Sequence, residues 1–167
     1  MSDAIDRFLE AARVLDHPVE VRRFPEGTKT AEDAARAIGC DVAQIVKSLV
    51  FVADGEPVLA LTSGANRVDK RRLAELAGAG TVRRADAEEA RSATGFAVGG
   101  TPPFGHPSRL RAFLDRDLLA HEDVWAAAGT PDSVFRTSPS ELQRSAEAEV
   151  VDLKESGSPR IVDPFNR

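Results

Sequence analysis

Apolar residues recur at helical spacing at the start of the chain, which predicts a first helix with one buried stripe. The stripe consists of Ile5, Phe8, Leu9, Ala12 and Leu15. His17-Pro18 ends this helix. Four more helices are predicted where a polar residue of the favoured N-cap type precedes an apolar or acidic turn. They begin at Thr30, Asp69, Asp86 and Ser138.

Strand patterns lie between these helices. The clearest is Ile45 to Ala53, which is almost continuously apolar and is therefore predicted to be buried on both faces. Asp54-Gly55 is typical of a two-residue hairpin turn, and Glu56 to Thr62 returns as the partner strand. Weaker strands are predicted at 19–24, 81–84, 110–114, 123–128, 133–137 and 150–153, with a brief one at the start of 96–107. Interleaved helices, strands and hairpins predict an α+β fold with a mixed sheet.

Length and composition fit one domain. The chain has 167 residues, of which 42% are hydrophobic. We assign residues 1–154 to the domain and 155–167, which contain Gly157, Pro159 and Pro164 without apolar periodicity, to a flexible C-terminal tail. Acidic residues among the first thirteen argue against a secretory signal, and no apolar run is long enough to cross a membrane. We therefore expect a cytoplasmic protein with no membrane partner.

The net charge of −5 argues mildly against a nucleic-acid binder, but the charges are unevenly distributed. Residues 67–84 hold six basic and two acidic side chains. This stretch is a candidate phosphate contact, and the alternative is an ordinary solvated helix face. The four basic residues that begin it are Arg67, Lys70, Arg71 and Arg72.

Metal, disulfide and nucleophile chemistry have no positive sign in the sequence. Cys40 is the single cysteine and there are three histidines, so neither an internal disulfide nor a zinc-ligand spacing can be assembled. Cys40 lies among apolar neighbours, which favours a core thiol over a nucleophile. No nucleophile-elbow or phosphate-loop motif occurs. We expect no metal and no cofactor.

Lys47 is unusual because it interrupts the apolar strand. Strand alternation places it on one face with Ile45, Leu49 and Phe51, where an ammonium needs partners or an opening. One interpretation is that it extends to the sheet margin. The other is a cation at the floor of a pocket, where it can stabilise developing negative charge. Ser48 points to the opposite face, so the two are poorly placed as a Ser–Lys nucleophile pair.

The loop that follows position 98 is the second unusual segment. It runs Gly99, Gly100, Thr101, Pro102, Pro103, Phe104, Gly105 and His106. Glycines let a backbone approach a ligand and prolines fix its shape, so the loop is either a binding element or a rigid surface turn. His106 is either an acid/base group or a hydrogen-bonded structural residue.

Three segments together resemble the YbaK family of free-standing aminoacyl-tRNA editing proteins, which is related to the editing domain of prolyl-tRNA synthetase. They are Ile38-Gly39, the strand from Gln44 to Phe51, and the loop from Ala97 to Gly105. The resemblance runs from about Val14 to Leu153. It implies a single-domain α+β fold whose mixed, mostly antiparallel sheet is barrel-like and flanked by helices.

The resemblance also implies an enzyme that cleaves the ester between a wrong amino acid and the tRNA 3′ end. Lys47 matches the family's essential lysine and is the predicted catalytic residue. Gly99 to Pro103 matches the Gly-x-x-x-Pro loop beside the scissile carbonyl. The predicted substrate-binding residues are this loop, its continuation to His106, and Ser48. The implied partner is the acceptor end of a mischarged tRNA. The basic residues of 67–72 are the candidate contact for it, and a synthetase is a further candidate partner. No metal is implied.

Two departures from the family leave the amino acid open. Some members that clear alanine carry a histidine where this chain has Trp125 to Thr130, which holds none, and others have Gln at the position of His106. Ala, Cys, Ser and Thr therefore all stay candidates. Two other functions compete: a binding or regulatory module that keeps the pocket without turnover, and a hydrolase of small esters or amides that needs no tRNA.

Overall fold

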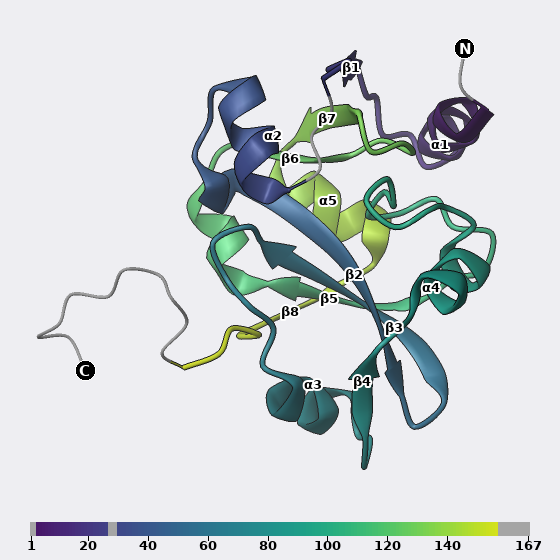
Figure 1. The fold of residues 1–167 in the computed structure, drawn as a ribbon, viewed down its shortest axis with the longest axis vertical. Coiled ribbons are helices and arrows are strands. Elements are labelled where there is room, and N and C mark those ends of the chain that lie inside the picture. Colours follow the sequence, from purple (N-terminus) through teal and green to yellow (C-terminus); the bar gives the residue numbers. More distant parts are fainter. Residues whose placement is uncertain (1–2, 27–29, 157–167) are drawn as a thin grey trace, which may run out of the picture.

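The computed structural model describes residues 3–26 and 30–156 and shows helices packed around one mixed sheet (Figure 1). The helices are α1 (Asp3–Val14), α2 (Ala31–Ile38), α3 (Lys70–Ala77), α4 (Ala87–Thr94) and α5 (Pro139–Ala146), with 3-10 turns η1 (Val42–Gln44) and η2 (Arg116–Ala120). The strands are β1 (Val21–Arg23), β2 (Ile45–Ala53), β3 (Glu56–Ser63), β4 (Val82–Arg84), β5 (Arg111–Asp115), β6 (Val124–Ala127), β7 (Ser133–Thr137) and β8 (Glu149–Val151).

The long hairpin of β2 and β3 is the centre of the sheet. The strand order is β1-β7-β6-β2-β3-β5-β8, and β4 pairs separately with the far end of β2. Pairs β1/β7, β2/β3, β2/β4 and β6/β7 are antiparallel, whereas β2/β6, β3/β5 and β5/β8 are parallel. The predicted α+β class and mixed, mostly antiparallel sheet are confirmed.

Helices cover both faces of this sheet. On one face, α1, α4 and α5 pack on a core that includes Val46, Val50, Leu61 and Phe135. On the other face, α3 packs near Phe51 and Phe113. The same face also carries α2, which packs on Ile45, Trp125 and Val134. Alternate residues of β2 thus face the two layers, as the continuous apolar pattern of this strand predicts.

Local sequence signals account for most element boundaries. The side chains of Thr30, Asp69, Asp86 and Ser138 accept backbone N–H groups in the first turn of the helices they precede, as predicted. Asp54 and Gly55 both adopt positive φ in the β2/β3 turn. One prediction is wrong: no strand lies within residues 96–107, which form turns and bends because their glycines and prolines suit no ladder.

The end of the described chain is attached to the domain. The Glu155 amide donates to the Arg67 carbonyl at 2.9 Å, and Lys154 forms a bridge with Val68. The remainder of the predicted tail, from residue 157, lies outside the described residues. Within the described part of the chain, no helix is both long and apolar enough to cross a membrane.

Candidate active site

The sheet has a gap along one edge of β2. β3 pairs with β2 from Val46 to Ala53, but on the opposite edge β6 pairs only with Ile45 and Val46, and β4 only with Phe51 to Ala53. No strand in the described ranges pairs with residues 47–50 on that side. The three residues 47–49 are also the half-buried part of an otherwise largely buried strand.

A cavity of about 300 Å³ occupies this gap, within the size range of small-molecule sites. Because it opens around a strand edge, it is lined by residues from both faces of β2, Lys47 and Ser48 included. Most of the other lining side chains are small or apolar. They come from the start of α2, from β4, α4, the loop after α4, β6 and the turn before β7, and include Thr30, Ala31, Arg84, Ala90, Val98, Trp125, Ala127 and Pro131.

Lys47 is fixed at this cavity by a backbone acceptor. Its Nζ donates to the Asn66 carbonyl oxygen at 2.7 Å. Burial lowers the pKa of the Lys47 ammonium. The nearby carboxylates of Glu32 and Asp115 raise this pKa, while Arg84 and Arg67 lower it further. The ammonium therefore has a hydrogen-bond partner and keeps donor capacity for a ligand.

The turn at 63–66 holds the acceptor of Lys47 in place. The Asn66 side-chain amide donates to both Asp115 and Asp117 at 2.9 Å, and Asp115, 1% exposed, also accepts the Ser63 amide at 3.0 Å. Gly64 fits here because a Cβ would lie 2.5 Å from the Val42 carbonyl oxygen. The local sequence indicates only a chain break here, because Asp115 and Asp117 lie 49 and 51 residues beyond Asn66 in the chain.

Ser48 faces the other layer, as predicted. Its hydroxyl is buried and has no hydrogen-bond partner among the residues described. Its location on the opposite face from Lys47 agrees with the expectation that the two do not form a nucleophile pair. Both nevertheless line one cavity, which strand alternation alone does not reveal.

The predicted loop, residues 99–106, divides between cavity and core. Gly99 and Thr101 line the cavity, together with Val98. Gly100 packs against the turn before β7, where an added Cβ would lie 2.7 Å from the Thr130 Cα. Phe104 is 2% exposed and lies 4.8 Å from the His17 ring and 5.2 Å from the Phe8 ring, centroid to centroid.

The remaining loop residues do not line the cavity. Pro102 and Pro103 are buried, and a Cβ at Gly105 would lie 2.9 Å from the Ala11 side chain of α1. His106 Nε2 donates to the Pro102 carbonyl oxygen at 2.8 Å. Burial lowers the pKa of His106. The geometry favours the structural alternative for this histidine, a hydrogen-bonded side chain that closes its own loop.

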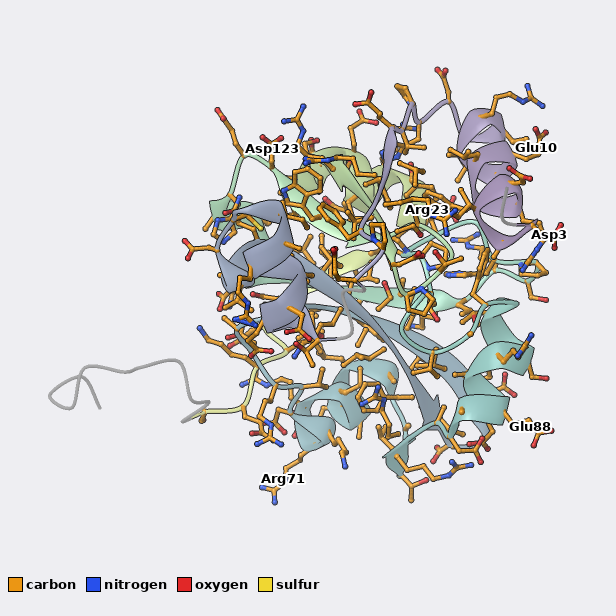
Figure 2. All side chains as sticks on the ribbon, turned by 45° about the horizontal axis from the view of Figure 1, so that its top comes forward. Asp3, Glu10, Arg23, Arg71, Glu88 and Asp123 are labelled. Carbon is orange, nitrogen blue, oxygen red and sulfur yellow. The ribbon has the colours of Figure 1, made fainter. Side chains whose placement is uncertain are left out.

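The basic residues lie at a different surface. Lys70, Arg71 and Arg72 begin α3 and are exposed, and Arg71 extends away from the domain at this end (Figure 2). Arg72 lies 3.9 Å from the Asp152 carboxylate. Among the four predicted tRNA-contact residues, Arg67 is the one linked to the site, because it follows Asn66, which binds Lys47, and its charge acts on the Lys47 ammonium. Arg84 lines the cavity itself, and its guanidinium lies 5.8 Å from the Phe51 ring centroid.

Sequence reasoning missed the walls contributed by α2, β6 and β7. No local signal marks Ala31, Trp125 or Pro131 as site residues, because the packing of α2 on the sheet and the parallel β2/β6 pairing bring them to the cavity. Cys40 is half-buried against the α2 core, and burial raises the pKa of its thiol, which agrees with a core role. Within residues 3–26 and 30–156, no three His, Cys, Asp or Glu side chains gather as a metal site requires.

Known proteins share this architecture over nearly the whole chain. A solved structure described as a candidate trans-editing enzyme for prolyl tRNA synthetase superposes with a TM-score of 0.89 at 45% identity, covering 93% of this chain and 99% of that one. YwhH of Bacillus subtilis (strain 168), described as uncharacterized, is 31% identical over 124 residues, which are 74% of this chain and 78% of YwhH.

A similar sequence forms part of a larger enzyme. A proline--tRNA ligase of Nitratidesulfovibrio vulgaris is 37% identical over 110 residues, which are 66% of this chain but 19% of the ligase. The similarity thus concerns one part of the ligase. A family model described as the aminoacyl-tRNA editing domain matches residues 25–145, which include β2, the cavity and the loop. The chain therefore belongs to the aminoacyl-tRNA editing domain family, as a YbaK-like domain related to the editing domain of prolyl-tRNA synthetase.

Proposed function

We propose that this protein is a trans-acting aminoacyl-tRNA deacylase that removes a small, wrongly attached amino acid from tRNA. The observation that carries the proposal is the half-buried ammonium of Lys47 in a cavity at an unpaired strand edge. A cation held this way can stabilise the negative charge that develops on an ester carbonyl oxygen. tRNA-Pro is the candidate acceptor, because the relatives include proline--tRNA ligases and a candidate trans-editing partner of that synthetase.

The reaction requires no covalent intermediate with the protein. Water attacks the ester carbonyl carbon, the bond between that carbon and the ribose oxygen breaks, and a proton passes to that oxygen. The products are a free amino acid and an intact tRNA. An aminoacyl ester is already activated, so positioning and charge stabilisation suffice and neither a metal nor a side-chain nucleophile is needed.

The cavity lining supports a small amino acid. Ala31, Ala34, Ala90, Ala126 and Ala127 contribute much of its wall. The cavity of about 300 Å³ lies at the lower end of the range for small-molecule sites, which favours a small side chain over a bulky one. Ala, Cys, Ser and Thr are therefore the candidate substrates, and a single methylene separates some of them by only about 1–3 kcal/mol.

The tRNA body is proposed to lie over the basic residues that follow β3. Arg67 connects the two regions, since its neighbour Asn66 binds Lys47 and its own charge lowers the pKa of Lys47. Lys70, Arg71 and Arg72 then extend the positive surface along α3. Arg84, at the cavity wall, adds a second positive charge beside Lys47.

A panel of mischarged tRNAs separates this function from its alternatives. The expected result is release of amino acid from one or two of Ala-, Cys-, Ser- and Thr-tRNA, with the same amino acid esters of free adenosine hydrolysed far more slowly. A binding or regulatory module would bind tRNA and release nothing. A small-ester hydrolase would cleave both substrates equally well. Either of these two results contradicts the proposal.

A further inference from the structure

The backbone of β2 alternates between two edges, and this alternation identifies free hydrogen-bonding groups in the cavity. The Gly64 amide donates to the Ile45 carbonyl at 2.7 Å on the β3 side, whereas the Ala85 amide donates to the Val50 carbonyl at 3.0 Å on the opposite side. Groups two residues apart point to the same edge. The Ser48 N–H and C=O therefore point away from β3, into the gap between β6 and β4.

The ends of the two neighbouring ladders confirm that strand pairing does not use these groups. The parallel ladder of β6 stops at Val46, and the antiparallel ladder of β4 starts at Phe51. Between them lie four residues of β2, or about 13 Å at ~3.3 Å per residue. A space of this length accepts at most about four residues in extended conformation, and the Val50 carbonyl at its far end already accepts the Ala85 amide. The gap therefore admits a short ligand and excludes a longer added strand.

We propose that the aminoacyl group of the substrate occupies this gap as a single strand residue paired with Ser48. The substrate carbonyl oxygen accepts the Ser48 N–H, and the substrate α-amino group donates to the Ser48 C=O. This is the hydrogen-bonded pair of an antiparallel ladder, reduced to one residue. The inference rests on the proposed function and specifies how that site recognises its substrate.

This pairing sets the direction of the rest of the substrate. An antiparallel partner of Ser48 directs its carboxyl end toward Val46 and β6. The ester oxygen and the terminal ribose then leave the gap past Lys47, where Trp125 and Pro131 line the cavity. The Ser48 N–H and the Lys47 ammonium thus act on the same carbonyl group, one as a backbone donor and the other as a charge.

The pairing also places the substrate side chain. Directly opposed residues of an antiparallel pair project their side chains to the same face. The substrate side chain therefore lies on the Ser48 side, toward Ala90 and Val98. The Ser48 hydroxyl, which is buried without a partner among the residues described, is then available to a hydroxyl on the substrate. Serine and threonine are thereby favoured over alanine.

Removal of the Ser48 amide tests the proposal without breaking the β2/β3 ladder, which uses the residues on either side. Ser48→Pro deletes this N–H, and a locally unpaired edge tolerates proline. We expect kcat/KM to fall by roughly 10²–10³ relative to Ser48→Ala, the usual loss for one oxyanion donor. Equal rates for the two variants, both with the wild-type melting temperature, would overturn the proposal.

A second replacement covers the case in which Ser48→Pro does not fold. An amide-to-ester replacement at Ser48 exchanges only its N–H for oxygen, and the same loss is expected. The matched control is the same replacement at Ala60, whose amide belongs to the β2/β3 ladder opposite Leu49. The Ala60 change weakens the sheet but leaves the gap intact, so an equal loss in both proteins would contradict the inference.

Two substrate comparisons test the other contacts. Propionyl-tRNA lacks the α-amino group, and its enzymatic rate relative to its spontaneous rate is expected to be at least tenfold below that of alanyl-tRNA. Ser48→Ala is expected to remove the preference for seryl- over alanyl-tRNA. An undiminished propionyl rate, or an unchanged seryl preference in Ser48→Ala, would refute the amino and hydroxyl contacts respectively.

A binding measurement distinguishes failure of this inference from failure of the proposed function. The probe is 3′-alanylamino-3′-deoxyadenosine, an amide that cannot turn over as the ester does. In ¹⁵N-resolved NMR, the Ser48 amide proton is expected to move downfield on titration. Binding without that shift would disprove the pairing even in an active enzyme. The shift without turnover of any tRNA would retain the pairing and disprove the deacylase.

Discussion

The edge of β2 and the loop at 99–106 both have an unusual residue composition, but they have different roles in the structure. Lys47 and Ser48 line the cavity, whereas only Gly99 and Thr101 of the loop reach it. The other loop residues pack on α1, on the turn before β7 or on their own backbone. The comparison shows that a composition suited to ligand binding also suits close packing, and that a missing strand pair is the better sign of a site.

The largest expected effect is a loss of stability when the loop at 99–106, rather than the edge of β2, is changed. Phe104→Ala removes a ring that packs on Phe8, His17 and Phe135 in the core. We expect the free energy of unfolding to fall by about 3–5 kcal/mol in chemical denaturation. The folded fraction should still bind the adenosine amide probe, because the ring does not line the cavity. Lost binding in a fully folded variant would place Phe104 in the site.

Gly100→Val, also in the loop at 99–106, should lower the free energy of unfolding by a smaller amount. A side chain here meets the Thr130 backbone rather than the open cavity. Overpacking of this kind costs about 1–3 kcal/mol. The melting temperature is therefore expected to fall more clearly than KM rises. A stable variant with a greatly raised KM would show instead that this glycine contacts substrate.

The pH dependence of activity should follow the titration of Lys47, at the β2 edge, and not any group of the loop. Burial lowers the pKa of Lys47, and the proposed chemistry requires its cation. Activity should therefore be complete below this lowered pKa and fall about tenfold per pH unit above it, at a lower pH than an ordinary lysine with a pKa near 10.4 would give. Single-turnover rates, corrected for spontaneous hydrolysis, measure this. A rate that stays level up to the ordinary lysine pKa would contradict the assignment.

The smallest effect is expected from the surface at α3. Arg71→Ala should weaken tRNA binding a few-fold at low salt and reduce the slope of log affinity against log salt by about one. Arg13→Ala, an exposed arginine on α1, is the matched control. If the two variants behave alike, α3 is a solvated helix face and not a tRNA contact.

Much of the fold follows from local signals, and much of the site does not. The β2/β3 hairpin, the helix caps and the unusual position of Lys47 depend on residues within one or two turns of each other, so the sequence predicts them. The acceptor of Lys47, by contrast, is fixed by Asp115 and Asp117. The cavity exists because β6 and β4 each pair with only part of β2. Such partial pairing depends on tertiary packing, which local propensity does not determine.

The most direct test of the central claim is the single-turnover deacylation rate of Lys47→Met with the best tRNA of the panel. Lys154→Met is the control, because Lys154 pairs with Asp117 at 2.9 Å and does not line the cavity. We predict a loss of at least about 10²-fold for Lys47→Met with no fall in melting temperature, and a change below about tenfold for Lys154→Met. A folded Lys47→Met protein with the wild-type rate would show that the half-buried ammonium is not the source of catalysis.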